Sequence, residues 1–170
     1  MTNTQPLGLK EFMRDKIIKI LATGFGLGYG PVAPGTFGTI LGSLLFYIFR
    51  FKSQVWLIEF SVLLAVVSIY IAHQAEKIYK QKDCQKIVID EVVGVLFCYC
   101  FVPYSMFNLI VGFILFRIFD VVKIFPANTA QNKLKGGYGV VCDDLVAGIQ
   151  AGVLLYFLPT IINWVTLVLK

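Results

Sequence analysis

Two long apolar stretches, residues 55–75 and 145–170, constrain this chain more than any other feature of its sequence. Each is close to the ~20 residues that an α-helix needs to cross a lipid bilayer. Hydrophobic residues make up 58% of the chain and charged residues only 15%, whereas ordinary soluble domains have roughly 45–50% and about 25%. We therefore expect an all-α, small multi-helical integral membrane protein, folded as a single domain over residues 1–170.

Shorter segments complete the expected set of helices. Apolar runs at residues 36–51, 92–102 and 106–120 predict three further helices. Residues 10–22 mix basic and apolar side chains in the way typical of a helix that lies in the headgroup plane of a membrane. The segment TGFGLGYGPVAPG, residues 23–35, is rich in glycine and proline and predicts irregular backbone.

The basic residues predict how these helices are oriented. If the segments alternate across the membrane, twelve of the fifteen lysines and arginines fall on one side, which is then the cytoplasmic side. The Gly/Pro-rich and acidic loops gather on the same face. The chain has a net charge of +5. Because the chain is so apolar, we expect its basic side chains to interact with anionic lipid and not with nucleic acid. The twelve basic residues on the predicted cytoplasmic side are Lys10, Arg14, Lys16, Lys19, Lys77, Lys80, Lys82, Lys86, Arg117, Lys123, Lys133 and Lys135. The three on the other side are Arg50, Lys52 and Lys170.

Five of the ten acidic residues stand where apolar helices are expected to meet this face: Asp90, Glu91, Asp120, Asp143 and Asp144. Ionisable groups close to the hydrocarbon core are costly, which makes them candidates for function. Both doublets are expected at helix N-termini, where an acid is favourable, so a capping role stays open. One capping residue suffices, however, and the second charge of a doublet repels the first. Mg²⁺ is typically held by a couple of carboxylates together with water and substrate phosphate oxygens.

Basic residues that could bind a phosphate lie near one of these acids. Arg117, Asp120 and Lys123 are spaced three residues apart, so on a helix they lie within roughly 120° of one face. This spacing is that of a phosphate clamp, and equally that of a local salt-bridge ladder at a helix end.

Glycine-rich turns that lead into helices add backbone N–H groups that can cradle an anion. Gly35 and Thr36 belong to one such turn, and Gly137 belongs to a second. Glycine turns between membrane helices are common, so the second signal is weak by itself.

Taken in order, four motifs of this chain resemble phosphatidylglycerophosphatase A: TGFGLGYGPVAPGTFGT, IVIDEVVG, FRIFDVVKIFP and GGYGVVCDDLVAGI. They span a core from residue 22 to about residue 152. The resemblance implies a Mg²⁺-dependent phosphatase of bacterial membranes. Together with the apolar segments and the distribution of basic residues, it predicts a multi-pass protein of the bacterial cytoplasmic (inner) membrane with its active site facing the cytoplasm. It would remove the terminal phosphate of phosphatidylglycerophosphate and leave phosphatidylglycerol, a precursor of cardiolipin. Where the family usually has Lys-Pro-x-Pro, this chain has Ile124 in place of the first proline.

The residues and the resemblance together predict a set of roles. Four acids are expected to bind Mg²⁺, and the basic and turn residues are expected to bind the substrate phosphate. The nucleophile is either water or a carboxylate such as Asp120. The predicted metal ligands are Asp90, Glu91, Asp143 and Asp144; the predicted catalytic residues are Asp120, Lys123, Asp143 and Asp144; the predicted phosphate-binding residues are Arg117, Lys123, Gly35, Thr36 and Gly137.

The alternative from a different class is a divalent-cation carrier or channel with an acid-lined site, which predicts acids that face one another in the middle of the membrane. A CDP-alcohol phosphotransferase would also act on lipid phosphates, but its Asp-Gly-x-x-Ala-Arg motif is absent. The substrate partner is therefore expected to be a membrane phospholipid, and the sequence predicts no particular oligomeric partner.

Overall fold

The computed structural model describes residues 8–82, 84–123, 125 and 136–168, and over these residues the protein is all-helical. Two short 3-10 turns, Leu27–Tyr29 and Phe49–Phe51, accompany the helices. The α-helices are α1 (Leu9–Ala22), α2 (Pro34–Ile48), α3 (Gln54–Tyr79), α4 (Ile89–Tyr99), α5 (Met106–Val122) and α7 (Gly137–Val168). The predicted all-α class is confirmed, and every expected helix is present. The helix ends differ from the predicted ones by a few residues, except the start of α7, which differs by more.

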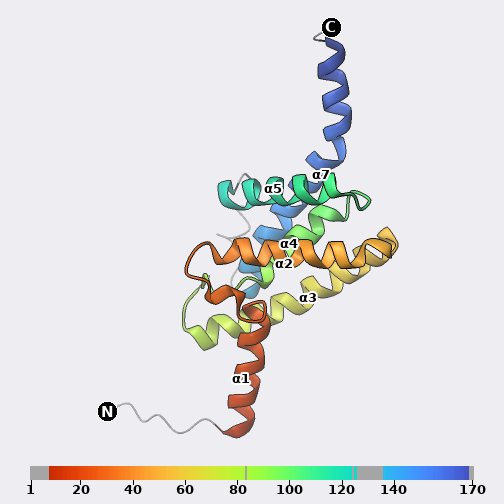
Figure 1. Ribbon diagram of the computed structural model, residues 1–170. Coiled ribbons are helices and arrows are strands. Elements are labelled where there is room, and N and C mark those ends of the chain that lie inside the picture. Colours follow the sequence, from red (N-terminus) through yellow and green to blue (C-terminus); the bar gives the residue numbers. More distant parts are fainter. Residues whose placement is uncertain (1–7, 83, 124, 126–135, 169–170) are drawn as a thin grey trace.

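The surface of the bundle is that of a membrane protein. Helices α3 and α7, of 26 and 32 residues, are long and apolar enough to cross a bilayer. Large apolar side chains are exposed along their outer faces, for example Leu63, which is 65% exposed, and Leu167, which is 74% exposed. Helix α7 continues through Pro159, and its outer part projects beyond the other helices (Figure 1).

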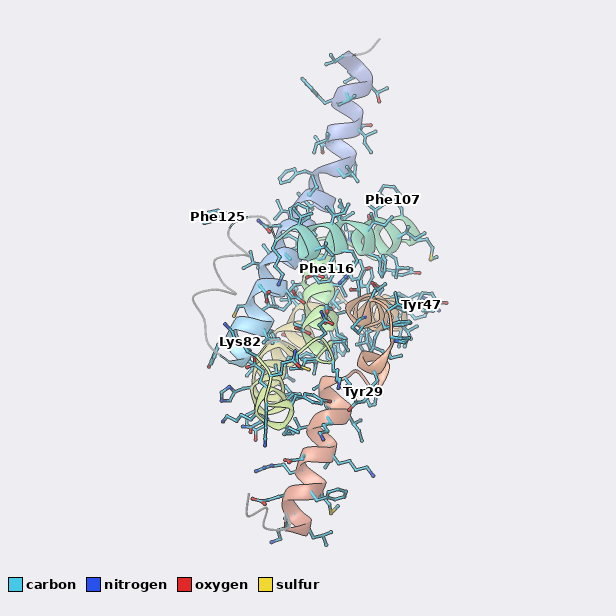
Figure 2. The ribbon with its side chains drawn as sticks, turned by 90° about the vertical axis from the view of Figure 1, so that its left-hand side faces the viewer. Tyr29, Tyr47, Lys82, Phe107, Phe116 and Phe125 are labelled. Atoms are coloured by element: carbon cyan, nitrogen blue, oxygen red, sulfur yellow. The ribbon has the colours of Figure 1, made fainter. Side chains whose placement is uncertain are left out.

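Helix α4 is the centre of the bundle. Nine of its eleven residues are buried, and it contacts α2, α3, α5 and α7. After Glu91 its sequence contains no charged residue, which suits a helix that is surrounded by others on every side. Phe116 of α5, fully buried, packs against Gly94 of α4 and lies in the middle of the bundle in Figure 2.

The helices alternate in direction, so that five helix ends gather at one end of the bundle. Helices α2, α4 and α7 begin at this end, and α3 and α5 finish there (Figure 1). Figure 2 looks onto it: Tyr29 belongs to the α1–α2 connection and Lys82 to the α3–α4 connection. The glycine, proline and acidic loops are therefore gathered on one face, as predicted; we call it the polar end.

Helices α4 and α7 run in the same direction and touch through their backbones. A Cβ atom on Gly148 of α7 would overlap the carbonyl oxygen of Gly94 in α4, and a Cβ atom on Gly94 would lie 2.8 Å from the carbonyl oxygen of Asp144. Small residues allow such close approach between helices in membranes. This contact draws the start of α7 onto the start of α4.

The last helix begins earlier than predicted. The expected range was 145–170, which put Asp143 and Asp144 at a helix N-terminus, but α7 starts at Gly137. The two aspartates therefore lie about two turns inside the helix. The expected position at a helix N-terminus was wrong, and the capping role that the sequence left open does not apply to Asp143 and Asp144. Gly137 packs against the carbonyl oxygen of Ile69 in α3, and the glycine-rich segment is helical there.

Adding a methyl group at the α4–α7 contact tests this packing. We expect Gly148→Ala to destabilise the protein by roughly 1–3 kcal/mol, the usual cost of overpacking, and to lower its melting temperature in detergent by several degrees. Val153→Leu adds one carbon to the exposed side of the same helix and serves as the control. Equal melting temperatures for the two variants would contradict the close contact.

Candidate active site

A pocket of about 450 Å³ opens at the polar end of the bundle. Four segments build it: the turn before α2, the α3–α4 connection, the first turn of α4 and the end of α5. It is lined by Ala33, Pro34, Gly35, Cys84, Gln85, Ile87, Asp90, Glu91, Arg117, Asp120, Val121 and Lys123.

Three carboxylates lie together beside this pocket. Asp90 and Glu91 come from the first turn of α4, and Asp144 reaches them from α7 across the Gly94–Gly148 contact. One oxygen atom from each of the three lies within 4.8 Å of the others. Asp90 is only 7% exposed and Asp144 only 4% exposed. The structure thus brings two of the predicted acidic motifs into one buried group, which we call the carboxylate triad.

The triad has the chemistry of a cation site. Asp90 Oδ1 and Glu91 Oε2 are buried, and neither has a hydrogen-bond partner among the described residues. A buried carboxylate oxygen without a partner is costly, and three neighbouring carboxylates repel one another. Oxygen ligands of this kind suit a hard divalent cation such as Mg²⁺. The residues present therefore fit the metal that the sequence predicts.

Asp143 lies apart from the triad. Its Oδ2 atom accepts a hydrogen bond from Lys123 Nζ at 2.6 Å, and its side chain is 4% exposed. Consecutive residues of a helix point about 100° apart, so the two aspartates of this doublet face different neighbours. The structure places Asp143 with Lys123 instead of with the other three predicted metal ligands.

The predicted phosphate clamp is divided into two ion pairs. Arg117 binds Asp120 one turn later on α5, with 2.5 Å between Nη1 and Oδ2, and Lys123 binds Asp143. Helix α5 ends at Val122, and Lys123 follows it in a left-handed conformation with φ of 48°. The helical spacing that would place Lys123 on the face of Arg117 therefore does not extend to it. Both cations still line the same pocket.

The three predicted turn residues have different surroundings. Gly35 is buried beside the acids, and a Cβ atom there would overlap Glu91 Oε1 and lie 3.2 Å from Arg117 Nη1. The backbone N–H of Thr36 already donates to the carbonyl oxygen of Ala33 at 2.9 Å. Gly137 packs against α3 and is not among the residues that line the pocket.

The sequence analysis missed several residues of this site. Cys84, Gln85 and Ile87 line the pocket, but no residue pattern marks the path of the α3–α4 connection. Ala33, with φ of 48°, is a second non-glycine residue in the left-handed region at the pocket wall, and such strain is common at functional sites. One available signal was overlooked: Gly94 and Gly148 each follow an acid of the triad by four residues.

Relatives of this chain were found among characterised and named proteins. It is 35% identical over 144 residues to a Bacteroides thetaiotaomicron protein named "Putative phosphatidylinositol-3-phosphatase", covering 80% of this chain and 89% of the relative. It is 33% identical over 142 residues to phosphatidylglycerophosphatase A of Escherichia coli K12, covering 82% and 81%. The corresponding Haemophilus influenzae protein is 34% identical over 159 residues, covering 92% and 96%. No solved structure matches the chain.

The family model described as phosphatidylglycerophosphatase A matches residues 20–159. This range includes the carboxylate triad, both ion pairs and the whole lining of the pocket. The model spans well over half of the chain, and the relatives named for the same activity match it along most of their length. The resemblance seen in the four sequence motifs is thereby confirmed, and the chain belongs to the phosphatidylglycerophosphatase A family of phosphatases.

Proposed function

We propose that this protein hydrolyses the terminal phosphate monoester of phosphatidylglycerophosphate to phosphatidylglycerol and phosphate, with Mg²⁺ as its cofactor, at the cytoplasmic face of a bacterial inner membrane. The observation that carries the proposal is the buried carboxylate triad beside a pocket lined by Arg117 and Lys123. Two oxygens of this triad have no hydrogen-bond partner within the part of the chain that the structure describes. Family membership supplies the reaction class.

Asp90, Glu91 and Asp144 are the residues that would hold the metal. When bound, Mg²⁺ would supply positive charge that neutralises the phosphate and polarises it for attack. The triad is buried at the base of the polar end, so the substrate phosphate would approach it through the pocket.

Arg117 and Lys123 would bind the phosphoryl oxygens. Each is oriented by a carboxylate, Asp120 and Asp143 respectively, and each keeps part of its side chain exposed, 21% and 31%. Charges that are held in place before the reaction contribute strongly to phosphoryl-transfer catalysis. Among the described residues, Asp120 is the carboxylate that lines the pocket outside the triad, so it is the candidate for a carboxylate nucleophile if water is not the attacking group.

A cation carrier or channel fits this arrangement less well. The acids gather at one end of the bundle together with two cations of the same pocket, and a fixed cation on the path repels a passing divalent cation. A channel would also need acids deeper along the bundle, where α4 carries only uncharged residues after Glu91.

The proposed orientation rests on side chains at both ends of the bundle. At the polar end Lys86 lies over the rings of Tyr79 and Tyr29, at 5.5 and 5.9 Å. At the opposite end Arg50 lies 4.3 Å from the ring of Tyr47. Aromatic rings with neighbouring cations are typical of the two membrane interfaces. The excess of lysine and arginine at the polar end favours the cytoplasm for that side.

Phosphate release from phosphatidylglycerophosphate in mixed micelles tests the proposed activity. We expect release with Mg²⁺, none with EDTA, and a loss of at least about 100-fold in Asp144→Asn, because this change removes one charge from the metal site. Mg²⁺ should also raise the melting temperature of the wild type and fail to do so in the variant. Asp15→Asn, on α1 outside the site, is the matched control. The assay should include phosphatidylinositol 3-phosphate, because the relative from Bacteroides is named for that lipid.

Normal turnover by Asp144→Asn would contradict the metal assignment. Folded wild-type protein that releases no phosphate from either lipid would contradict the phosphatase proposal and favour the cation carrier.

A second prediction concerns the lysine of the pocket. Lys123→Gln should lower kcat/KM by roughly 10–100-fold, because it removes a charge-assisted contact to the phosphate and leaves Asp143 buried without its cation. Lys82→Gln removes an exposed lysine from the same end of the protein and should have little effect. The measurement is the steady-state kcat/KM of both variants. Equal values for Lys123→Gln and Lys82→Gln would exclude a direct role for Lys123.

A further inference from the structure

We propose that the apolar groove between α2 and α5 holds one acyl chain of the phospholipid substrate during the reaction. The inference rests on the proposed lipid phosphatase function and names where the hydrophobic part of that substrate is bound. It starts from a groove of about 490 Å³ that is separate from the polar pocket. Its walls are Ile40, Leu44 and Tyr47 of α2 and Ile110, Phe113 and Ile114 of α5.

The groove offers almost no polar surface to an occupant. The hydroxyl of Ser43, which also borders it, is hydrogen-bonded to Tyr99 Oη at 2.8 Å. Tyr99 Oη in turn donates to the carbonyl oxygen of Leu109 at 2.9 Å. These groups are thereby satisfied within the protein, so the groove suits a hydrocarbon chain and no polar ligand.

The same two helices carry both the groove and the pocket. Gly35 of α2 and Arg117 of α5 line the pocket, and α2 and α5 are in contact. Ile40 follows Gly35 by five residues, which is about one and a half turns of α2, and Ile114 precedes Arg117 by three residues, so these two are neighbours on one face of α5. Helix α2 begins at the polar end and α5 finishes there (Figure 1), so the residues of the groove lie farther from the polar end along both helices than the residues of the pocket.

The distance along α2 from the pocket to the far end of the groove matches the thickness of one leaflet. From Gly35 to Tyr47 the helix rises about 18 Å at ~1.5 Å per residue, and one leaflet is about half of a hydrocarbon core of ~30 Å. A phospholipid whose phosphate lies in the pocket would therefore extend its chain along the groove toward Tyr47.

A second groove, between α5 and α7, does not connect in this way. It is larger, about 700 Å³. Gln150 lies in its wall, and the side-chain amide of this residue donates to the carbonyl oxygen of Phe125 at 2.9 Å. Phe125, two residues after the pocket residue Lys123, thus lies against the wall of this groove. Phe125 is not among the residues that line the groove between α2 and α5.

The test compares one substitution at two exposed leucines. Leu44→Trp fills the proposed groove, whereas Leu63→Trp adds the same ring to the outer face of α3; the two leucines are 48% and 65% exposed. We would measure kcat/KM for phosphatidylglycerophosphate with long acyl chains and with six-carbon chains. Leu44→Trp should lower the ratio of long-chain to short-chain kcat/KM at least about tenfold, equivalent to lost contact with about two methylene groups. Leu63→Trp should leave this ratio unchanged.

An unchanged ratio in Leu44→Trp would overturn the proposal, and so would the same ratio change in both variants. Short-chain turnover by the wild type shows that the phosphatase function holds even if the groove proposal fails. A binding measurement tests the groove even if the purified protein shows no turnover. Phosphatidylglycerol with a photoactivatable group on one acyl chain should label residues 40–47 and 109–114 more than residues 62–67. Equal labelling of all exposed faces would show that lipid contacts the protein non-specifically, and would overturn the proposal.

Discussion

The backbone contact between Gly94 and Gly148 is the constraint on which the site depends. It sets the distance between the two helices that carry the triad, and it lies one turn beyond Asp90 and Asp144. A larger residue at either position would separate α4 from α7 and move Asp144 away from the acids of α4. The favourable packing of α4 against four neighbouring helices offsets the repulsion among the carboxylates that this approach brings together.

Electrostatics are the reason that we propose a bound cation at the polar end. Five carboxylates and two cations make up the described part of the site, and Arg117 and Lys123 each have a carboxylate beside them. A phosphate would add further negative charge. At low dielectric an uncompensated excess of this kind is unfavourable, so metal and substrate binding should support one another. The proposed Mg²⁺ at the triad would make both the clustering of the carboxylates and the binding of a phosphate favourable.

Much of this site could be predicted from the sequence, since every acid that it uses stands where an apolar segment reaches the polar end. The separation of Asp143 from Asp144 could not, because it depends on where α7 begins. Three glycines near residue 137 read locally as a turn, and contact with α3 overrides that preference. The position of Lys123 depends on the left-handed residue that ends α5, which spacing alone does not reveal. Gly137 illustrates the same limit: a glycine can serve helix packing as well as ligand binding.

The spacing of four residues between acid and glycine, present in both α4 and α7, has a consequence for how the family can vary in length. Inserting or deleting one residue within either spacing would turn the acid about 100° relative to the helix contact and point it away from the triad. Such changes should be absent from active homologues between residues 90 and 94 and between residues 144 and 148. We therefore expect active homologues to differ in length only outside these two helical turns, where a difference does not alter the direction of the triad carboxylates.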